Sequence, residues 1–169
     1  NNLKVIFLDV DGVLNSNDYK EYTLKNNIKG ILKEVNPKTI DMLKYALDIT
    51  GAQIVVSSSW RNVPQFEYLR NLFLEHGINL KEKTPVIEHK RGLEIKQYLK
   101  EHTTIEQYLI LDDEKFDSFD EELINNLILT KEDPNDHSYG NGLQIKHIEQ
   151  IIERLGRAKQ KEFESDDER

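Results

Sequence analysis

The chain has 169 residues, of which 37% are hydrophobic and 32% are charged, and its formal net charge is −8. This length predicts a single domain with one hydrophobic core, and the net charge argues against an indiscriminate binder of polyanions without excluding a local basic patch. The chain has no cysteine, which excludes disulfides, zinc–thiolate sites and thiol nucleophiles and is compatible with a reducing compartment. No apolar run approaches the roughly 20 residues of a membrane span, and the first residues lack the layout of a signal peptide. We therefore expect a cytoplasmic protein with no membrane partner.

The first predicted strand ends at two acidic residues. Residues 5–8 form an apolar run that is typical of a strand buried on both faces. Asp9, Asp11 and Gly12 follow at the carboxyl end of this strand, which is where open α/β sheets carry their sites. Two carboxylates this close require a cation or a proton between them, and Mg²⁺ prefers oxygen ligands. The pair indicates phosphate chemistry, with a solvated turn after a core strand as the alternative.

The next part of the chain predicts two helices and a second strand. Apolar residues at helical spacing predict a short amphipathic helix over residues 24–35, within a flap of about 14–35. Asn36 followed by proline is a typical cap, and it opens a helix over residues 37–51 that ends at a glycine. Residues 54–56 form a second buried strand.

The second half of the chain continues this alternation. Its predicted elements are a helix over 64–76, a helix over 91–101, strands at 108–111 and 127–129, and a final helix that contains 148–155. Strands that alternate with helices predict a three-layer α/β fold with a parallel sheet.

The predicted elements indicate one domain over residues 1–157. Residues 158–169 are highly charged and predict a disordered tail.

Polar residues follow three of the predicted strands. Asp9 follows the first, Ser57 and Ser58 follow the second, and Asp112 and Asp113 follow the third. Because the carboxyl ends of parallel strands share one edge of a sheet, we expect these side chains to converge. Ser57 and Ser58 have a helix-capping loop as their structural alternative.

A basic pair, Lys90 and Arg91, lies at the start of the helix predicted over 91–101 and is followed by Gly92. A cation near the acids would lower the repulsion between a carboxylate and an anionic substrate. A solvated basic pair is the alternative.

Asp9-Val10-Asp11-Gly12-Val13 after an apolar strand resembles the first motif of the haloacid dehalogenase (HAD) superfamily. The resemblance implies a three-layer Rossmann-like core. It also implies that Asp9 is a nucleophile that forms an aspartyl-phosphate, and that Asp11 acts as general acid and then general base, as in the phosphatases of that superfamily.

The other motifs are similar to the remaining HAD motifs. Ser57 corresponds to the hydroxyl that holds the phosphate together with neighbouring backbone amides, and Ser58 to an adjacent phosphate contact. Arg91, with Lys90 as the second choice, corresponds to the third-motif cation. The two acids of the fourth motif imply Mg²⁺ bound by four carboxylates, at Asp9, Asp11, Asp112 and Asp113, with Asp113 as ligand or as support for the first acid.

Longer segments resemble the HAD domains of the Swiss-army-knife RNA-repair group. They are Val-Ser-Ser-Ser-Trp-Arg at 56–61, Arg-Gly-Leu-Glu-Ile-Lys-Gln-Tyr-Leu at 91–99 and Tyr-Leu-Ile-Leu-Asp-Asp-Glu at 108–114. This resemblance covers residues 4 to about 155 and implies a phosphorylated substrate, with the end of a nucleic acid as the leading candidate.

The spacing of the motifs leaves no room for a full cap domain, so we expect an open site with only a small flap. An open site suits a bulky substrate such as an oligonucleotide end. Lys25, Lys29 and Lys33 share one face of the predicted flap helix, where they would either contact a nucleic-acid backbone or form a solvated face. Trp60 and Arg61 would stack on a base or grip a second phosphate, with a core position for Trp60 as the alternative.

Two other functions remain open at this point. One is a small-molecule phosphatase such as a nucleotidase, with its site completed by oligomerisation. The other is a catalytically idle HAD domain that is used for binding, which the presence of Asp9, Asp11, Arg91 and Asp112 argues against.

Overall fold

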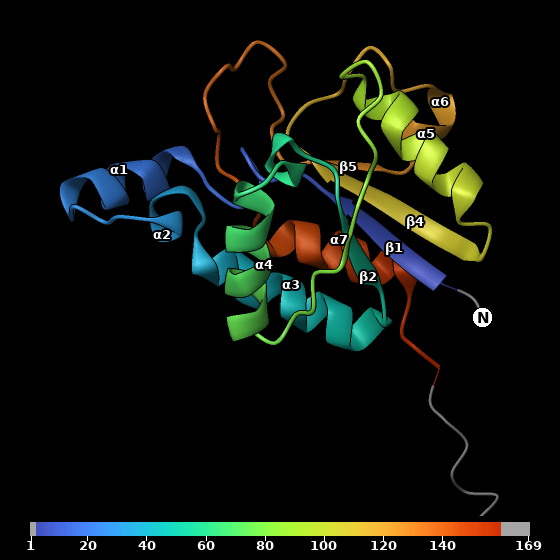
Figure 1. The fold of residues 1–169 in the computed structure, drawn as a ribbon, viewed down its shortest axis with the longest axis horizontal. Helices are drawn as coiled ribbons and strands as arrows, with labels where there is room; N and C mark the ends of the chain where they lie inside the picture. Colours follow the sequence, from blue (N-terminus) through green and yellow to red (C-terminus); the bar gives the residue numbers. More distant parts are fainter. Residues whose placement is uncertain (1–2, 160–169) are drawn as a thin grey trace, which may run out of the picture.

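A parallel sheet of five strands forms the centre of the computed structural model (Figure 1), which describes residues 3–159. The strands are β1 (Leu3–Leu8), β2 (Gln53–Val56), β3 (Glu82–Lys83), β4 (Ile105–Asp112) and β5 (Leu127–Leu129). They lie in the order β3-β2-β1-β4-β5, and every neighbouring pair is parallel. The predicted α/β fold with a parallel sheet is confirmed.

Helices cover both faces of this sheet (Figure 1). On one face, α3 (Pro37–Thr50), α4 (Gln65–Glu75) and α7 (Ile145–Leu155) pack against side chains such as Leu8 and Leu111. On the other face, α5 (Arg91–Glu101) and α6 (Glu121–Asn125) pack against Phe7, Val55 and Ile110. Because β1 is buried on both faces, its sequence is a continuous apolar run instead of an alternating one.

Most of the predicted elements are confirmed. The predicted strands lie within β1, β2, β4 and β5, and the helices predicted over 37–51, 64–76, 91–101 and 148–155 correspond to α3, α4, α5 and α7. The sequence pattern does not predict β3 and α6, because β3 has two residues, both exposed, and α6 has five. None of the helices in residues 3–159 combines the length and apolar character of a membrane span. Most of the predicted charged tail, residues 160–169, lies outside the described residues.

The single helix predicted over residues 24–35 is wrong. The flap instead contains two short helices, α1 (Asn17–Lys25) and α2 (Ile31–Glu34), which project from one end of the sheet (Figure 1). Between them Asn27 and Gly30 adopt positive φ angles of 52° and 71°, which the right-handed helix does not allow. Leu24, an apolar residue at the start of that predicted helix, is 75% exposed.

This break also separates the three flap lysines. Lys25 ends α1, Lys29 lies in the connection and Lys33 lies in α2, so they do not share one face of a continuous helix. All three remain exposed to solvent.

The connection from β5 to α7 closes against the start of the flap. The Leu143 N–H donates to the Val13 carbonyl at 2.8 Å. Gly142 has a φ of 67°, and a Cβ at this position would lie closer than 3.0 Å to the Asn15 carbonyl oxygen. This contact fixes the backbone that leaves β1 just after Asp9.

Replacing Gly142 with Ala should destabilise the fold more than replacing Gly30 with Ala. Both glycines have positive φ, 67° and 71°, so each alanine carries a backbone cost of about 1–2 kcal/mol. Of the two alanines, the one at Gly142 collides with another part of the chain, whereas nothing in the described part of the chain lies within 4 Å of a Cβ at Gly30. Overpacking adds about 1–3 kcal/mol. Urea unfolding measures both variants, and equal losses would contradict the packing of Gly142 on Asn15.

Candidate active site

Three neighbouring strands deliver polar residues to the same level of the sheet. The Ser57 N–H donates to the Leu8 carbonyl at 2.8 Å, and the Asp9 N–H donates to the Leu111 carbonyl at 3.0 Å. These bonds continue the parallel registers of β1 with β2 and β4 past the last apolar residues. Ser57, Asp9 and Asp112 therefore stand side by side at the carboxyl edge, as the sequence predicts.

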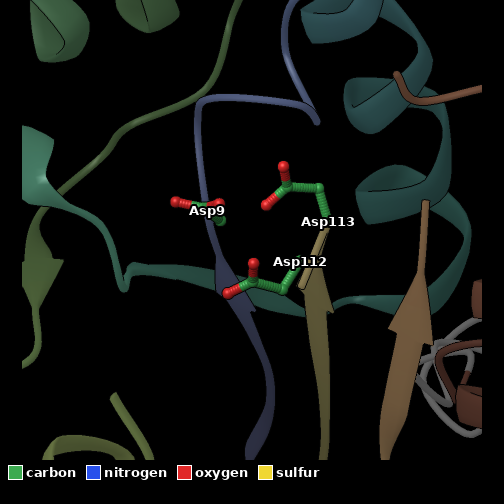
Figure 2. A group of neighbouring side chains, drawn as sticks. All are labelled: Asp9, Asp112 and Asp113. Atoms are coloured by element: carbon green, nitrogen blue, oxygen red, sulfur yellow. The ribbon is translucent and has the colours of Figure 1, made fainter. Parts of the chain in front are cut away.

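Asp9, Asp112 and Asp113 form a compact cluster of carboxylates (Figure 2). One carboxylate oxygen from each lies within 4.8 Å of the others, and Asp9 and Asp112 are only 7% and 1% exposed. Burial raises the pKa of Asp9 to about 7, although the nearby Arg91 guanidinium opposes this shift. Burial and the neighbouring Asp9 carboxylate also raise the pKa of Asp112 well above its usual range. An oxygen-only cluster of this kind fits a hard divalent cation such as Mg²⁺.

The backbone at Gly12 makes room for this cluster. Gly12 has a φ of 79°, and a Cβ there would lie closer than 3.0 Å to the Asp113 carboxylate. The Thr130 hydroxyl donates to the Gly12 carbonyl at 2.8 Å, which ties this turn to the end of β5. The glycine of the first motif is therefore required for Asp113 to approach Asp9.

Arg91 is the cation that reaches the acids. Its Nη1 lies 3.0 Å from Asp112 Oδ2 and 3.5 Å from Asp9 Oδ1. Lys90 is exposed at the cap of α5, so the geometry favours Arg91 over Lys90 as the third-motif cation.

Close packing at the start of α5 positions Arg91. The Gly92 N–H donates to Ser118 Oγ at 2.9 Å, and a Cβ at Gly92 would lie closer than 3.0 Å to the Ser118 carbonyl. The Arg91 guanidinium also lies over the Phe116 ring, 4.9 Å from its centroid. The loop that follows Asp113 therefore presses the helix start against the acid cluster.

Ser57 has a buried hydroxyl that is free for a ligand. The residue is 1% exposed, and its Oγ has no hydrogen-bond partner among the described residues. Ser58 differs, because its Oγ accepts from the Trp60 N–H at 3.2 Å and so caps a short 3₁₀ helix, η1 (Ser59–Arg61). A buried hydroxyl without a partner is costly, and a bound phosphate oxygen would satisfy it.

Asp11 lies outside the three-carboxylate cluster in the described residues. Its carboxylate accepts a hydrogen bond from Asn15 Nδ2 at 3.2 Å. The Asn15 side chain is buried, donates to the Glu34 carbonyl at 2.8 Å and accepts from the Gly12 N–H at 2.7 Å. Asn15 thus connects Asp11 to the flap, a role that its place in the sequence does not reveal.

The Arg61 side chain is buried and bound by other residues of the fold, so it is not exposed to contact a phosphate. Its Nη1 lies 2.6 Å from Glu94 Oε1, and this ion pair is buried. The same nitrogen donates to Thr84 Oγ1 at 3.1 Å and to the Pro85 carbonyl at 3.0 Å. Glu94 Oε1 also lies 3.9 Å from Arg91 Nε, so one carboxylate links both arginines.

The family model for the HAD domain in Swiss Army Knife RNA repair proteins matches residues 5–134. The chain belongs to this family. The matched segment runs from β1 to beyond β5 and includes Asp9, Ser57, Arg91 and both acids at the end of β4. A search of curated proteins and a search of solved structures each found no match.

A second cation of this HAD domain lies on the other side of the acid cluster. Lys131, just after β5, places its Nζ 3.5 Å from Asp113 Oδ2 and donates to the Ser138 carbonyl at 2.8 Å. The sequence gives no signal for this contact, because an isolated lysine in a charged loop is typical of a solvated surface. Arg91 and Lys131 together partly offset the charge of the three carboxylates.

Replacing Glu94 with Gln should destabilise the HAD domain strongly, because it leaves the buried Arg61 guanidinium without its counter-charge. Loss of one partner of a buried ion pair costs about 3–5 kcal/mol. Glu67→Gln is the matched control, since Glu67 pairs with Arg70 at 2.7 Å but both side chains are nearly half exposed. That substitution should cost less than about 1 kcal/mol. Urea unfolding that gave the same loss for both variants would contradict the structural role of Glu94.

In the metal-free protein, the free energy of unfolding should fall as the pH rises from about 4 to about 7. Asp9 has a pKa of about 7 when folded and about 3.9 when unfolded. Between these values the folded state holds a proton that the unfolded state has lost. The free energy of unfolding therefore decreases by about 2–4 kcal/mol as the pH rises. Urea unfolding in chelator at several pH values measures this decrease.

Asp9→Asn should flatten the pH profile by removing the contribution of Asp9, while the buried Asp112 retains its own. Mg²⁺ should restore the stability of the wild type near neutral pH by binding the ionised acids. Parallel pH profiles for the wild type and Asp9→Asn would show that the buried acid cluster does not control stability.

Proposed function

We propose that the chain is a Mg²⁺-dependent phosphomonoesterase that works through an aspartyl-phosphate on Asp9. The observation that carries this proposal is the buried hydroxyl of Ser57, which has no hydrogen-bond partner among residues 3–159 and follows the strand next to β1. It lies at the same sheet edge as a carboxylate cluster and a guanidinium. A nucleophile, a cation site and an unsatisfied donor at one edge are the parts that phosphoryl transfer requires.

In the first step, a carboxylate oxygen of Asp9 attacks phosphorus and the bond to the leaving oxygen breaks. Asp11 donates a proton to that oxygen, and the product is an aspartyl-phosphate. Arg91 and the Ser57 hydroxyl stabilise the charge on the phosphoryl oxygens during the transfer.

In the second step, Asp11 takes a proton from a water molecule that attacks the same phosphorus atom. The bond between phosphorus and the Asp9 oxygen breaks, which releases inorganic phosphate and regenerates both acids. Mg²⁺, held by Asp9, Asp112 and Asp113, would supply positive charge that allows Asp9 to ionise beside an anionic substrate. The raised pKa of Asp9 in the metal-free site is the physical reason for that requirement.

We further propose that the phosphate lies at the end of a nucleic acid. The family to which the chain belongs is described from RNA repair proteins. Within residues 3–159, the flap consists of α1 and α2 and the segment between β2 and α5 contains η1, α4 and β3, so neither of these two segments carries a large insertion. A nucleotidase is the alternative, since the same open edge admits a mononucleotide.

Asp9→Asn should lower the hydrolysis of an aryl phosphate by about 10³-fold or more, because it removes the nucleophile and preserves the shape of the side chain. Chelation of the metal should have a similar effect in the wild type. The measurement is a steady-state assay with and without Mg²⁺. Asp48→Asn is the control, because Asp48 is exposed and pairs only with Lys44 in the described contacts.

A near wild-type rate for Asp9→Asn, or full activity without a divalent cation, would refute the covalent mechanism. The same assay with phosphorylated oligonucleotides and mononucleotides separates the two substrate proposals, since equal rates for both would favour the nucleotidase.

A further inference from the structure

A groove of about 820 Å³ lies between the flap and α4, and its lining includes Ser59 and Trp60, which directly follow Ser57 and Ser58 in the chain. Its walls carry two aromatic side chains, Trp60 and Tyr68, and three side-chain amides, Asn62, Gln65 and Asn71. Tyr68 is 56% exposed, and Trp60 is partly buried against the core and also lines the groove. The volume is within the range of about 300–1,000 Å³ that is usual for small-ligand sites.

The chemistry of this groove suits a nucleobase better than a phosphate chain. Aromatic rings stack on bases of any sequence, and side-chain amides both donate and accept hydrogen bonds at base edges. The described residues that line the groove include two glutamates, Glu34 and Glu75, and neither a lysine nor an arginine. Carboxylates in this position repel phosphates, so the groove does not follow a nucleic-acid backbone.

Each wall of the groove is connected to the candidate active site through the chain or through a hydrogen bond, although the catalytic candidates themselves do not line it. On one wall, Ser59 and Trp60 follow directly after Ser57 and Ser58 at the end of β2. On the other wall, the Glu34 carbonyl accepts a hydrogen bond from the Asn15 side chain, which also donates to Asp11. Because the proposed role of Asp11 is to protonate the leaving oxygen, the leaving group would extend toward the wall that Asn15 connects to Asp11.

We propose that this groove binds the nucleobase of the leaving nucleoside. The substrate class is then a phosphomonoester whose leaving group carries a base, held by stacking on Trp60 and Tyr68 and by the neighbouring amides. This inference rests on the proposed phosphatase function and adds the group that the enzyme recognises. Recognition by a base also predicts that substrate preference changes little with salt, unlike recognition by the flap lysines.

The first experiment compares substrates with and without a base. Wild-type protein should hydrolyse a nucleoside monophosphate with a kcat/KM about 5- to 100-fold higher than ribose phosphate, which corresponds to the stacking of one base. The same ratio should hold for a phosphorylated oligonucleotide with a normal or an abasic terminal nucleotide, at low and at high salt.

Tyr68→Ala should reduce this ratio, mainly through a higher KM for the substrate that carries the base. Tyr45→Ala is the matched control, because Tyr45 is 61% exposed on α3 and does not line the groove. It should leave the ratio unchanged. Equal reductions in the two variants would assign the preference to a site outside the groove and overturn the proposal.

The second experiment uses the fluorescence of Trp60, the single tryptophan of the chain. In the Asp9→Asn variant, a nucleoside monophosphate should quench this fluorescence, whereas ribose phosphate and inorganic phosphate should leave it nearly unchanged. Equal quenching by all three ligands, or by none, would overturn the groove assignment.

The two proposals fail in distinguishable ways. Equal hydrolysis of nucleoside monophosphate and ribose phosphate by the wild type leaves the phosphatase function intact and overturns the base site. If the wild type hydrolyses no phosphomonoester, the proposed function is wrong, and the fluorescence titration alone then decides whether the groove binds a base.

Discussion

Mutual repulsion among three carboxylates at the end of a buried parallel sheet is the constraint on which the rest of the site depends. Asp9 and Asp112 are held at one level by the backbone bonds between β1 and β4, and Asp113 joins them because Gly12 has no side chain. Such a cluster is costly without positive charge, and two cations from other parts of the chain, Arg91 and Lys131, lie against it. The fold therefore keeps a cluster of acids at a cost to its own stability, as is usual at functional sites, and such a cluster suits the divalent cation and the anionic substrate that we propose.

Contacts around the cluster keep its members in position. The loop after β4 packs against the start of α5 through Gly92, which brings Arg91 to the acids. Glu94, one turn further along α5, pairs with the buried Arg61 and lies near Arg91, so the loop after β2 and the helix share one carboxylate. On the opposite side, Asn15 holds Asp11 and the end of the flap together. Each of these contacts joins segments that carry different parts of the proposed chemistry.

The sequence predicts the sheet and the polar strand ends well, because a buried parallel strand is a local apolar run and its last residue determines which side chain reaches the edge. It predicts the flap poorly, since the helical spacing over 24–35 ignores the positive φ angles at Asn27 and Gly30. It also misses Asn15, Glu94 and Lys131, whose roles come from contacts with residues distant in the chain or from burial that no local pattern reveals. Arg61 is an instructive case. Its proximity to Ser57 in the sequence suggests a phosphate contact, whereas the fold buries its guanidinium against Glu94.

The central claim is that Asp9 becomes covalently phosphorylated, and it can be tested by acid quenching. The protein is mixed with Mg²⁺ and an excess of aryl phosphate, quenched in acid within the first turnovers, digested and analysed by mass spectrometry. The account predicts that the peptide containing Asp9 carries one added phosphoryl group, and that this adduct is absent from Asp9→Asn. Rapid hydrolysis in the wild type with no phosphoryl group on Asp9, or with the group on another residue, would contradict the account.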